Sequence, residues 1–132
     1  MIVVDTNVVA YLFIPGERRS LASRALEKDP LWAVPLLWRS EFLNVLAIYM
    51  RQGILSLAEA LQLMNRAEVF LQGNQHHVDS GRVLSLVAGS KCSAYDCEFV
   101  ALAQQLGVPL VTTDDLILKE FPTVAVSLDA FV

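Results

Sequence analysis

Short, fully apolar segments alternate along the chain with segments of helical periodicity, and this alternation restricts the fold more than any other feature. The apolar segments have no regular polar positions, which is typical of strands covered on both faces in a parallel sheet. They lie at 2–4, 31–34, 108–112 and 124–127, and 74–78 forms either a turn or one more brief strand. Parallel strands need crossover connections, usually helices. We therefore expect an α/β fold, a three-layer sandwich with a central parallel sheet of four to five short strands flanked by helices.

Turn and cap residues delimit the helices between these strands. Pro15-Gly16 ends the first helix, and Gly53 and Gly107 follow later ones as left-handed caps. Ser56 and Glu59 form a capping-box pattern, and Ser93 is a further candidate N-cap. Helical spacing is seen over residues 8–13, 21–26, 36–52, 57–71, 82–88, 94–106 and 115–121.

Length and composition place the chain in a narrow class. With 132 residues, of which 55% are hydrophobic, we expect one domain over residues 1–132 and no intrinsic disorder. The longest hydrophobic run, Val8–Ile14, is far below the roughly 20 residues of a membrane span. Only two cysteines are present, Cys92 and Cys97, and no secretory leader is visible. These features predict a cytoplasmic protein without a disulfide framework or a membrane partner.

The charge is distributed unevenly over a net −4. Residues 1–66 carry seven basic and six acidic side chains, whereas residues 67–132 carry three and eight. This difference has two alternative explanations, a solvated acidic surface or an acidic site that requires cations. The chain has no overall basic field of the kind that holds nucleic acid by counterion release.

Four acidic residues lie at positions that indicate a ligand-binding site in an α/β protein. Asp5 ends the first strand and Asp114 follows the third, and ligands bind outside the carboxyl ends of parallel strands. Glu41 shares a helical face with apolar residues, where a carboxylate is costly without a partner. Asp96 lies in the first turn of its helix, three residues after Ser93.

Each acid also has a simpler explanation. Asp5, Asp96 and Asp114 could serve only as helix caps, and Glu41 could lie at the rim of a core helix. Four carboxylates that converge would instead require a compensating charge. Oxygen ligands without a His or Cys cluster favour Mg²⁺ or Mn²⁺.

Four stretches of the chain, in this order and spacing, resemble the PIN-domain ribonucleases, and most closely the VapC-type toxins of bacterial toxin–antitoxin pairs. They are residues 3–7 (VVDTN), 40–44 (SEFLN), 93–103 (SAYDCEFVALA) and 111–114 (VTTD). The resemblance implies a PIN fold and Mg²⁺- or Mn²⁺-dependent endonucleolytic cleavage of RNA. It also implies a homodimer inhibited by a small antitoxin of the VapB type, with a basic side chain reaching toward the acids.

The resemblance also assigns roles to individual residues. It makes Asp5, Glu41, Asp96 and Asp114 the catalytic quartet, of which Asp5, Asp96 and Asp114 hold the metal. Asp115 adjoins Asp114, so either could be the last ligand. The supporting polar residues that it implies are Thr6, Asn7, Asn44 and Thr112.

The chemistry expected of such a site is attack on phosphorus by water that a metal has activated. Glu41 either completes the metal shell or orients that water. From charge alone, the candidate RNA contacts are Arg18, Arg19, Arg24, Arg39 and Lys91. Two alternatives remain: a PIN module that binds metal, RNA or a partner without cleavage, and an RNA-maturation nuclease outside toxin–antitoxin biology.

Two of the expected helices, residues 36–49 and 57–71, carry apolar side chains on more than one face. A helix that is apolar nearly all round is normally buried. A domain of this size can bury only part of that surface in its own core, so the pattern favours a homodimer, the alternative being a monomer whose apolar residues all pack inside.

Overall fold

A five-stranded parallel sheet lies at the centre of the computed structural model, which describes residues 1–132. Its order is β3-β2-β1-β4-β5, and every neighbouring pair is parallel. This confirms the expected sheet and shows that segment 74–78 contains an edge strand. The strands are β1 (Ile2–Val4), β2 (Trp32–Pro35), β3 (Gln75–His76), β4 (Leu110–Thr112) and β5 (Ala125–Ser127).

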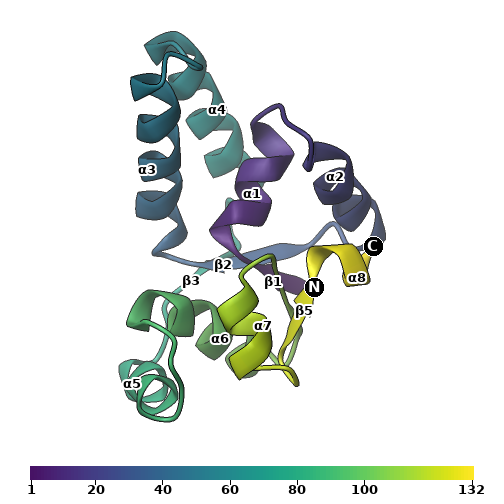
Figure 1. The fold of residues 1–132 in the computed structure, drawn as a ribbon, viewed down its shortest axis with the longest axis vertical. Coiled ribbons are helices and arrows are strands. Elements are labelled where there is room, and N and C mark those ends of the chain that lie inside the picture. The colour runs from purple at the N-terminus through teal and green to yellow at the C-terminus, as the bar shows by residue number, and fades with distance from the viewer.

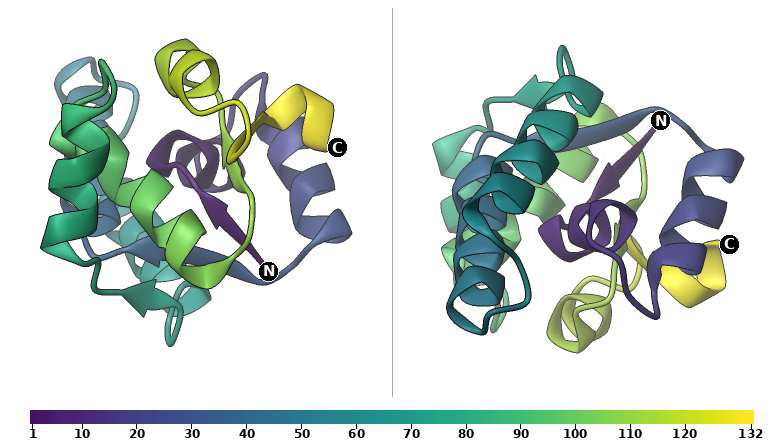
Figure 2. Two further views of the ribbon diagram at one scale, coloured as in Figure 1. Left: turned by 90° about the horizontal axis from the view of Figure 1, so that it is seen from below. Right: turned by 90° about the horizontal axis from the view of Figure 1, so that it is seen from above.

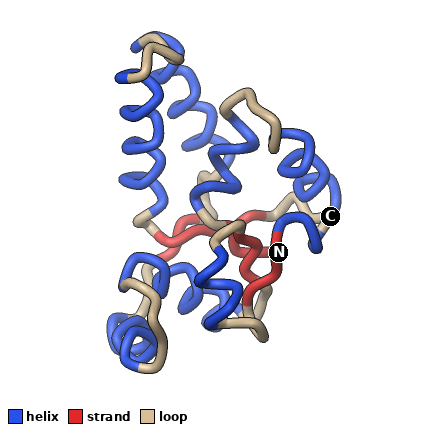
Figure 3. Tube along the Cα trace, in the orientation of Figure 1, coloured by secondary structure: helices blue, strands red, loops and turns tan.

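Helices cover both faces of the sheet, so the molecule has the expected three layers (Figure 1). Figure 3 shows the strands as a thin layer between the two groups of helices. On one face lie α1 (Thr6–Phe13), α2 (Arg19–Lys28), α3 (Trp38–Arg51), α4 (Leu57–Phe70) and α8 (Leu128–Phe131). On the other face lie α5 (Ser80–Ala88), α6 (Ala94–Leu106) and α7 (Asp115–Glu120).

The strands divide their side chains between two hydrophobic cores. Val4 and Val111 join the core under α1–α4, whereas Val3 and Leu110, one position earlier, join the core under α5–α7. This alternation follows from the two-residue period of a strand. It explains why these strands are almost wholly apolar, since both faces are covered.

Helix α1 lies between α2 on one side and the α3–α4 pair on the other, as Figure 2 shows from above. It begins at Thr6, two residues before the apolar spacing alone suggests, because Asp5 takes the N-cap position. The chain therefore turns from β1 directly into α1. This turn places the first polar residues of the chain at the carboxyl edge of the sheet.

Other element bounds differ from the sequence pattern for identifiable reasons. Strand β4 begins at Leu110 because the N–H of Val108 bonds to the carbonyl of Ala103 and belongs to the end of α6. Gly107 caps that helix with φ of 68°, a conformation that favours glycine. The one-turn helix α8 was not expected, since four residues carry no periodic signal.

None of these helices combines the length and the hydropathy that a membrane span requires.

Candidate acidic active site

The candidate site lies at the topological switch point of the sheet. From β1 the chain first builds β2 and β3 on one side and later β4 and β5 on the other. In such sheets a crevice forms outside the carboxyl ends of the two strands at the switch. Asp5 directly follows β1, and Asp114 follows β4 by two residues.

A cavity of about 230 Å³ occupies this crevice and contains all four predicted acids. No basic side chain lines it, and Val45 is its single apolar contributor. The fold therefore gathers carboxylates from four elements that are widely separated in sequence. The lining residues are Asp5, Thr6, Asn7, Glu41, Asn44, Val45, Asp96 and Asp114.

Each of the four acids stands at the N-terminus of a different helix. Asp5 and Asp114 occupy the N-cap positions of α1 and α7, and Glu41 and Asp96 lie in the first turns of α3 and α6. The positive end of a helix dipole stabilises a carboxylate, although only over the first turn. Four helix ends thus offset part of the repulsion within the cavity.

Thr112 joins the two strand-end acids through one hydroxyl group. It donates to Oδ2 of Asp5 at 2.7 Å and accepts from the backbone N–H of Asp114 at 3.0 Å. Thr112 is fully buried at the end of β4. Its hydroxyl fixes the direction of the Asp5 carboxylate relative to the turn that carries Asp114.

Thr6 holds the helix acid in a similar way. Its buried hydroxyl donates to Oε1 of Glu41 at 2.7 Å and links α1 to α3. Glu41 is half-buried and its other oxygen, Oε2, makes no hydrogen bond within the protein. It is therefore oriented by the fold, unlike a solvated rim residue, with one oxygen left for a ligand or a water.

Burial and mutual repulsion disfavour ionisation in the cavity. Burial raises the pKa of Asp5, and Asp114 and Asp96 raise it further, while the hydrogen bond from Thr112 opposes the rise. Burial likewise raises the pKa of Glu41, with added repulsion from Asp5 and Asp96. The pKa of Asp96 is raised by burial and then by Asp114.

The capping alternative applies to these acids to different degrees. Asp114 does cap α7, since Oδ1 accepts from the N–H of Ile117 at 2.9 Å, and it also lines the cavity. Asp5 makes no side-chain capping hydrogen bond to α1, although the nearby backbone N–H of Asn7 opposes the rise of its pKa. Asp115 is exposed and does not line the cavity, which favours Asp114 as the residue facing a ligand.

The candidate RNA contacts are scattered. Arg18 and Arg19 line a second cavity beside the acidic one. Arg39 pairs with Glu68 on α4, and its side chain lines neither cavity. The remaining two, Arg24 and Lys91, are exposed and also line neither cavity.

The cysteines and histidines do not contribute to the site. Cys92 and Cys97 are free and buried, and burial raises the pKa of Cys92 to about 11, with Asp96 adding to the rise. Such thiols are unreactive at neutral pH. His76 belongs to β3 at the edge of the sheet.

The donor set fits a hard divalent cation. Carboxylates, the amide groups of Asn7 and Asn44, and hydroxyls supply only oxygen ligands of the kind that Mg²⁺ and Mn²⁺ prefer. No three His, Cys, Asp or Glu side chains converge closely enough to enclose an ion by themselves. Mg²⁺ commonly keeps several waters and takes one or two carboxylates, so the open set remains compatible with it.

The raised pKa values predict how pH and metal affect stability. The native state binds protons to Asp5, Glu41 and Asp96 more tightly than the unfolded chain does, so the stability that these groups contribute at low pH is lost as pH rises through their raised native pKa values. We expect millimolar Mn²⁺ to raise the melting temperature by several degrees near about pH 7.5 and much less near about pH 4.5.

Thermal melts in EDTA and in Mn²⁺ measure this effect, and two single variants serve as a matched pair. Asp114→Asn keeps an N-cap but loses a cavity carboxylate, so the Mn²⁺ shift should shrink. Asp115→Asn should retain the wild-type shift. A wild-type melting temperature that is unchanged by Mn²⁺ at neutral pH would argue against a cation site among these acids.

The fold and the cavity together define an α/β protein with a carboxylate pocket at the switch point of a parallel sheet. Residues 2–123 match the sequence profile of the PIN domain. The chain therefore belongs to the PIN-domain family.

Comparison with individual proteins agrees with this assignment. The chain is 29% identical over 126 residues to Ribonuclease VapC3 of Pyrobaculum aerophilum, an alignment that covers 92% of this chain and 95% of that protein. Its fold matches a crystal structure of PAE2754 from the same organism, with a TM-score of 0.77, 18% identity and coverage of 98% and 91%.

Two further solved structures share the fold. FitAcB from Neisseria gonorrhoeae gives a TM-score of 0.72 at 17% identity, covering 97% of this chain and 98% of that one. A toxin–antitoxin complex from Klebsiella pneumoniae gives 0.67 at 22% identity, with the same coverage.

Three residues near the acids were not predicted from the sequence. Glu98 is half-buried, burial raises its pKa, and its charge adds to the repulsion felt by Glu41. Tyr11 and Tyr49 line the neighbouring cavity. A signal for Tyr49 was available, because it follows Glu41 by eight residues and therefore shares its helical face.

Proposed function

We propose that this protein is a Mg²⁺- or Mn²⁺-dependent endoribonuclease that hydrolyses phosphodiester bonds, and that it is the toxin of a type II toxin–antitoxin pair. The observation that carries the proposal is the single cavity in which four carboxylates from four elements meet without any basic residue. The ribonuclease name of the Pyrobaculum relative supports the substrate. We further propose that residues 1–132 form one PIN domain acting in the cytoplasm.

In this proposal each acid has a distinct role. Asp5, Asp96 and Asp114 would hold the cation, which would supply a lowered pKa for water and neutralisation of charge on the phosphate. Glu41, fixed by Thr6, orients the attacking water and takes up its proton through the free Oε2. Thr112 keeps Asp5 directed into the cavity.

Neighbouring polar residues complete the proposed site. Asn7 and Asn44 line the cavity and can hold phosphate oxygens or metal-bound waters through their side-chain amides. Asp115 lies outside the cavity, so we assign it no contact with substrate.

Cleavage of RNA by the purified protein tests the proposal. We expect cleavage in Mg²⁺ or Mn²⁺, none in EDTA, and none by the Asp5→Ala variant under any of these conditions. RNA that is bound but not cleaved by the wild-type protein with metal would favour a binding module instead.

The proposed inhibitor is a small VapB-type antitoxin. One of the matched folds comes from a structure named as a toxin–antitoxin complex from Klebsiella pneumoniae. The cavity holds four carboxylates and no basic partner, so an Arg or Lys from an antitoxin could replace the charge of the cation and exclude substrate.

We also propose a homodimer, formed through the exposed side of the α3–α4 pair. These helices stand away from the sheet in Figure 1 and carry a wholly apolar hollow of about 170 Å³ between them. Leu57 and Leu61 at this hollow are each 62% exposed. Exposed apolar patches of this kind mark protein interfaces. Leu43 is a further exposed apolar residue at this hollow, and Ile48, Ile54 and Val69 are exposed elsewhere on the two helices and the turn between them.

Light scattering on the isolated protein at micromolar concentration tests the homodimer. We expect a mass of about twice the 14.6 kDa of one chain. Leu61→Glu adds a charge at an exposed position and should give monomer without loss of fold, whereas Glu59→Gln on the same helix should remain dimeric. A wild-type mass near 14.6 kDa would refute the dimer.

A further inference from the structure

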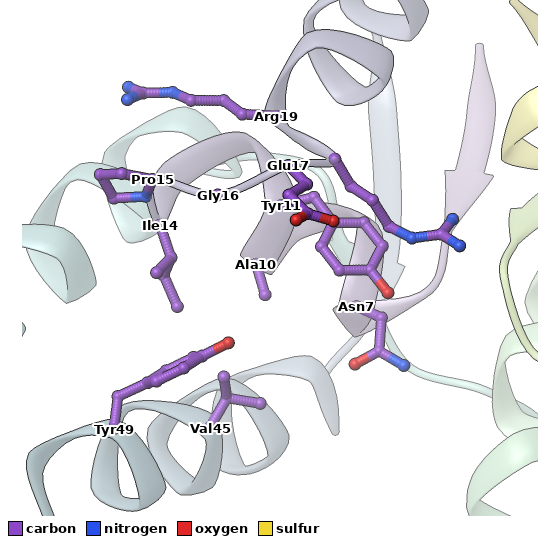
Figure 4. Close-up of a pocket in the computed structure, with 11 residues that line it drawn as sticks. Asn7, Ala10, Tyr11, Ile14, Pro15, Gly16, Glu17, Arg19, Val45 and Tyr49 are labelled. Carbon is purple, nitrogen blue, oxygen red and sulfur yellow. The ribbon is translucent and has the colours of Figure 1, made fainter. Parts of the chain in front are cut away.

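A second cavity, of about 310 Å³, continues the acidic pocket along the groove between α1 and α3 (Figure 4). Asn7 and Val45 line both cavities, so they are adjoining parts of one groove. Two tyrosines line the second part, Tyr11 from α1 and Tyr49 from α3. Its volume is at the lower end of the range for small-ligand sites.

The spacing of residues on α3 sets the direction of this groove. Glu41, Val45 and Tyr49 follow each other at intervals of four and therefore share one helical face. Eight residues advance about 12 Å along a helix axis. A polynucleotide with one phosphodiester at the acids would therefore reach Tyr49 within a short extension of its chain.

The second cavity differs from the first in charge. Two basic residues, Arg18 and Arg19, and one acidic residue, Glu17, line it, whereas the acidic cavity has no basic residue. The Arg18 guanidinium lies 5.6 Å from the centroid of the Tyr11 ring and 3.9 Å from a carboxylate oxygen of Asp129, so it supports that ring. Arg19 has no acidic partner, and Figure 4 shows it at the rim, directed away from the cavity. Its guanidinium is therefore an unpaired positive charge at the rim, outside the cavity.

The interior of the cavity presents a flat aromatic surface. In Figure 4 the ring of Tyr49 faces the side chain of Ile14 across the open space. Tyr49 is only half-buried, so part of its ring remains available. Aromatic rings of this kind stack nucleobases, and the contact tolerates any base because each has a π-face.

We propose that this cavity binds one nucleobase of the RNA, on one side of the scissile phosphate, by stacking on Tyr49, with Arg19 contacting the backbone at its rim. This inference rests on the proposed ribonuclease function and adds a subsite to it. A segment of an antitoxin is the other conceivable occupant. The arginine rim and the continuity with the acidic pocket favour a polyanion that spans both cavities.

Abasic substitution tests the subsite. The probe is a short single-stranded RNA that the wild-type protein cleaves at one position, selected from a randomised pool, with each nucleotide replaced in turn by an abasic ribose. We expect one position on one side of the cut to lose about tenfold in kcat/KM. Tyr49→Leu should lose this position-specific penalty, whereas Tyr49→Phe, which keeps the ring, should retain it.

Two further measurements separate stacking from general damage. Tyr95→Leu removes an exposed tyrosine that lines neither cavity and should keep the penalty at the same position. With Asp5→Asn protein, 2-aminopurine at that position should be quenched on binding, and the additional Tyr49→Leu change should abolish the quenching.

Equal abasic penalties in wild-type and Tyr49→Leu protein would overturn the subsite while leaving the ribonuclease intact. The subsite would also be overturned if Tyr49→Leu weakened only the inhibition by an antitoxin. A wild-type protein that cleaves no RNA would overturn the proposed function together with the subsite.

Discussion

Asp5→Asn should reduce RNA cleavage at least about a hundredfold, since loss of a residue that merely supports a metal ligand already costs 10–100-fold. The substitution removes one negative charge at a position between Thr112 and the cavity. Asn keeps a side-chain oxygen that can accept the hydrogen bond from the Thr112 hydroxyl, so the local geometry should be preserved. The rate of cleavage in millimolar Mn²⁺ measures the effect.

The same substitution should not destabilise the protein in EDTA. The raised pKa of Asp5 means that the native state disfavours its ionised form, so ionisation at neutral pH lowers the free energy of unfolding. Asn carries no charge and removes this destabilisation. We expect an equal or higher melting temperature than wild type at neutral pH, together with retained activity in the Asp115→Asn control. Undiminished cleavage by folded Asp5→Asn protein would exclude this cavity as the active site.

Trp38→Ala should have the largest effect on stability, about 3–5 kcal/mol. Trp38 is fully buried at the start of α3, and its ring stacks on Phe42 with centroids 5.9 Å apart. A loss of this size is a large share of the roughly 5–15 kcal/mol that stabilises a domain. Urea denaturation measures the free energy of unfolding.

Trp38→Phe should cost far less, within about 1.5 kcal/mol. It keeps an aromatic ring and removes the indole N–H, which is buried without a hydrogen-bond partner. Ser40→Ala, an exposed change in the same helical turn, should alter stability by less than about 0.5 kcal/mol. If Trp38→Ala were as stable as Ser40→Ala, this ring would not anchor the helix that carries Glu41.

The sheet was predictable because its strands are covered on both faces. Ile2–Val4, and Leu110 with Val111, carry apolar side chains toward both cores, and such runs are visible without knowledge of the partners. β3 was ambiguous because Gln75 and His76 are polar and become a strand only by pairing with β2. The four-residue helix α8 is too short for a periodic pattern.

The acids were predictable as a group because strand ends and helix starts are local features. Asp5 and Asp114 follow buried strands, and the parallel topology brings such ends to one edge. The hydrogen bonds that orient the acids depend on tertiary packing, since the one from Thr6 to Glu41 links two helices. They could not be predicted from local sequence. The neighbouring cavity was not predictable either, because Tyr49 faces Ile14 from another helix.

The basic residues that charge alone predicts as RNA contacts lie in different surroundings. Arg39 lies two residues before Glu41 in sequence but pairs with Glu68 on α4. Lys91 is exposed, and its backbone N–H bonds to Glu120. Only Arg18 and Arg19 lie beside the acids, because the turn between α1 and α2 brings them to the groove.

The chemical nature of the product ends tests the central claim most directly. Hydrolysis by water at the acidic cavity predicts that each cut leaves a phosphate monoester on one product end and only hydroxyl groups on the other, formed in Mn²⁺ and absent in EDTA. It also predicts cleavage when the nucleotide at the cut carries no 2′-hydroxyl group. Products that end in a 2′,3′-cyclic phosphate, or equal cleavage in EDTA, would contradict metal-dependent hydrolysis by this site.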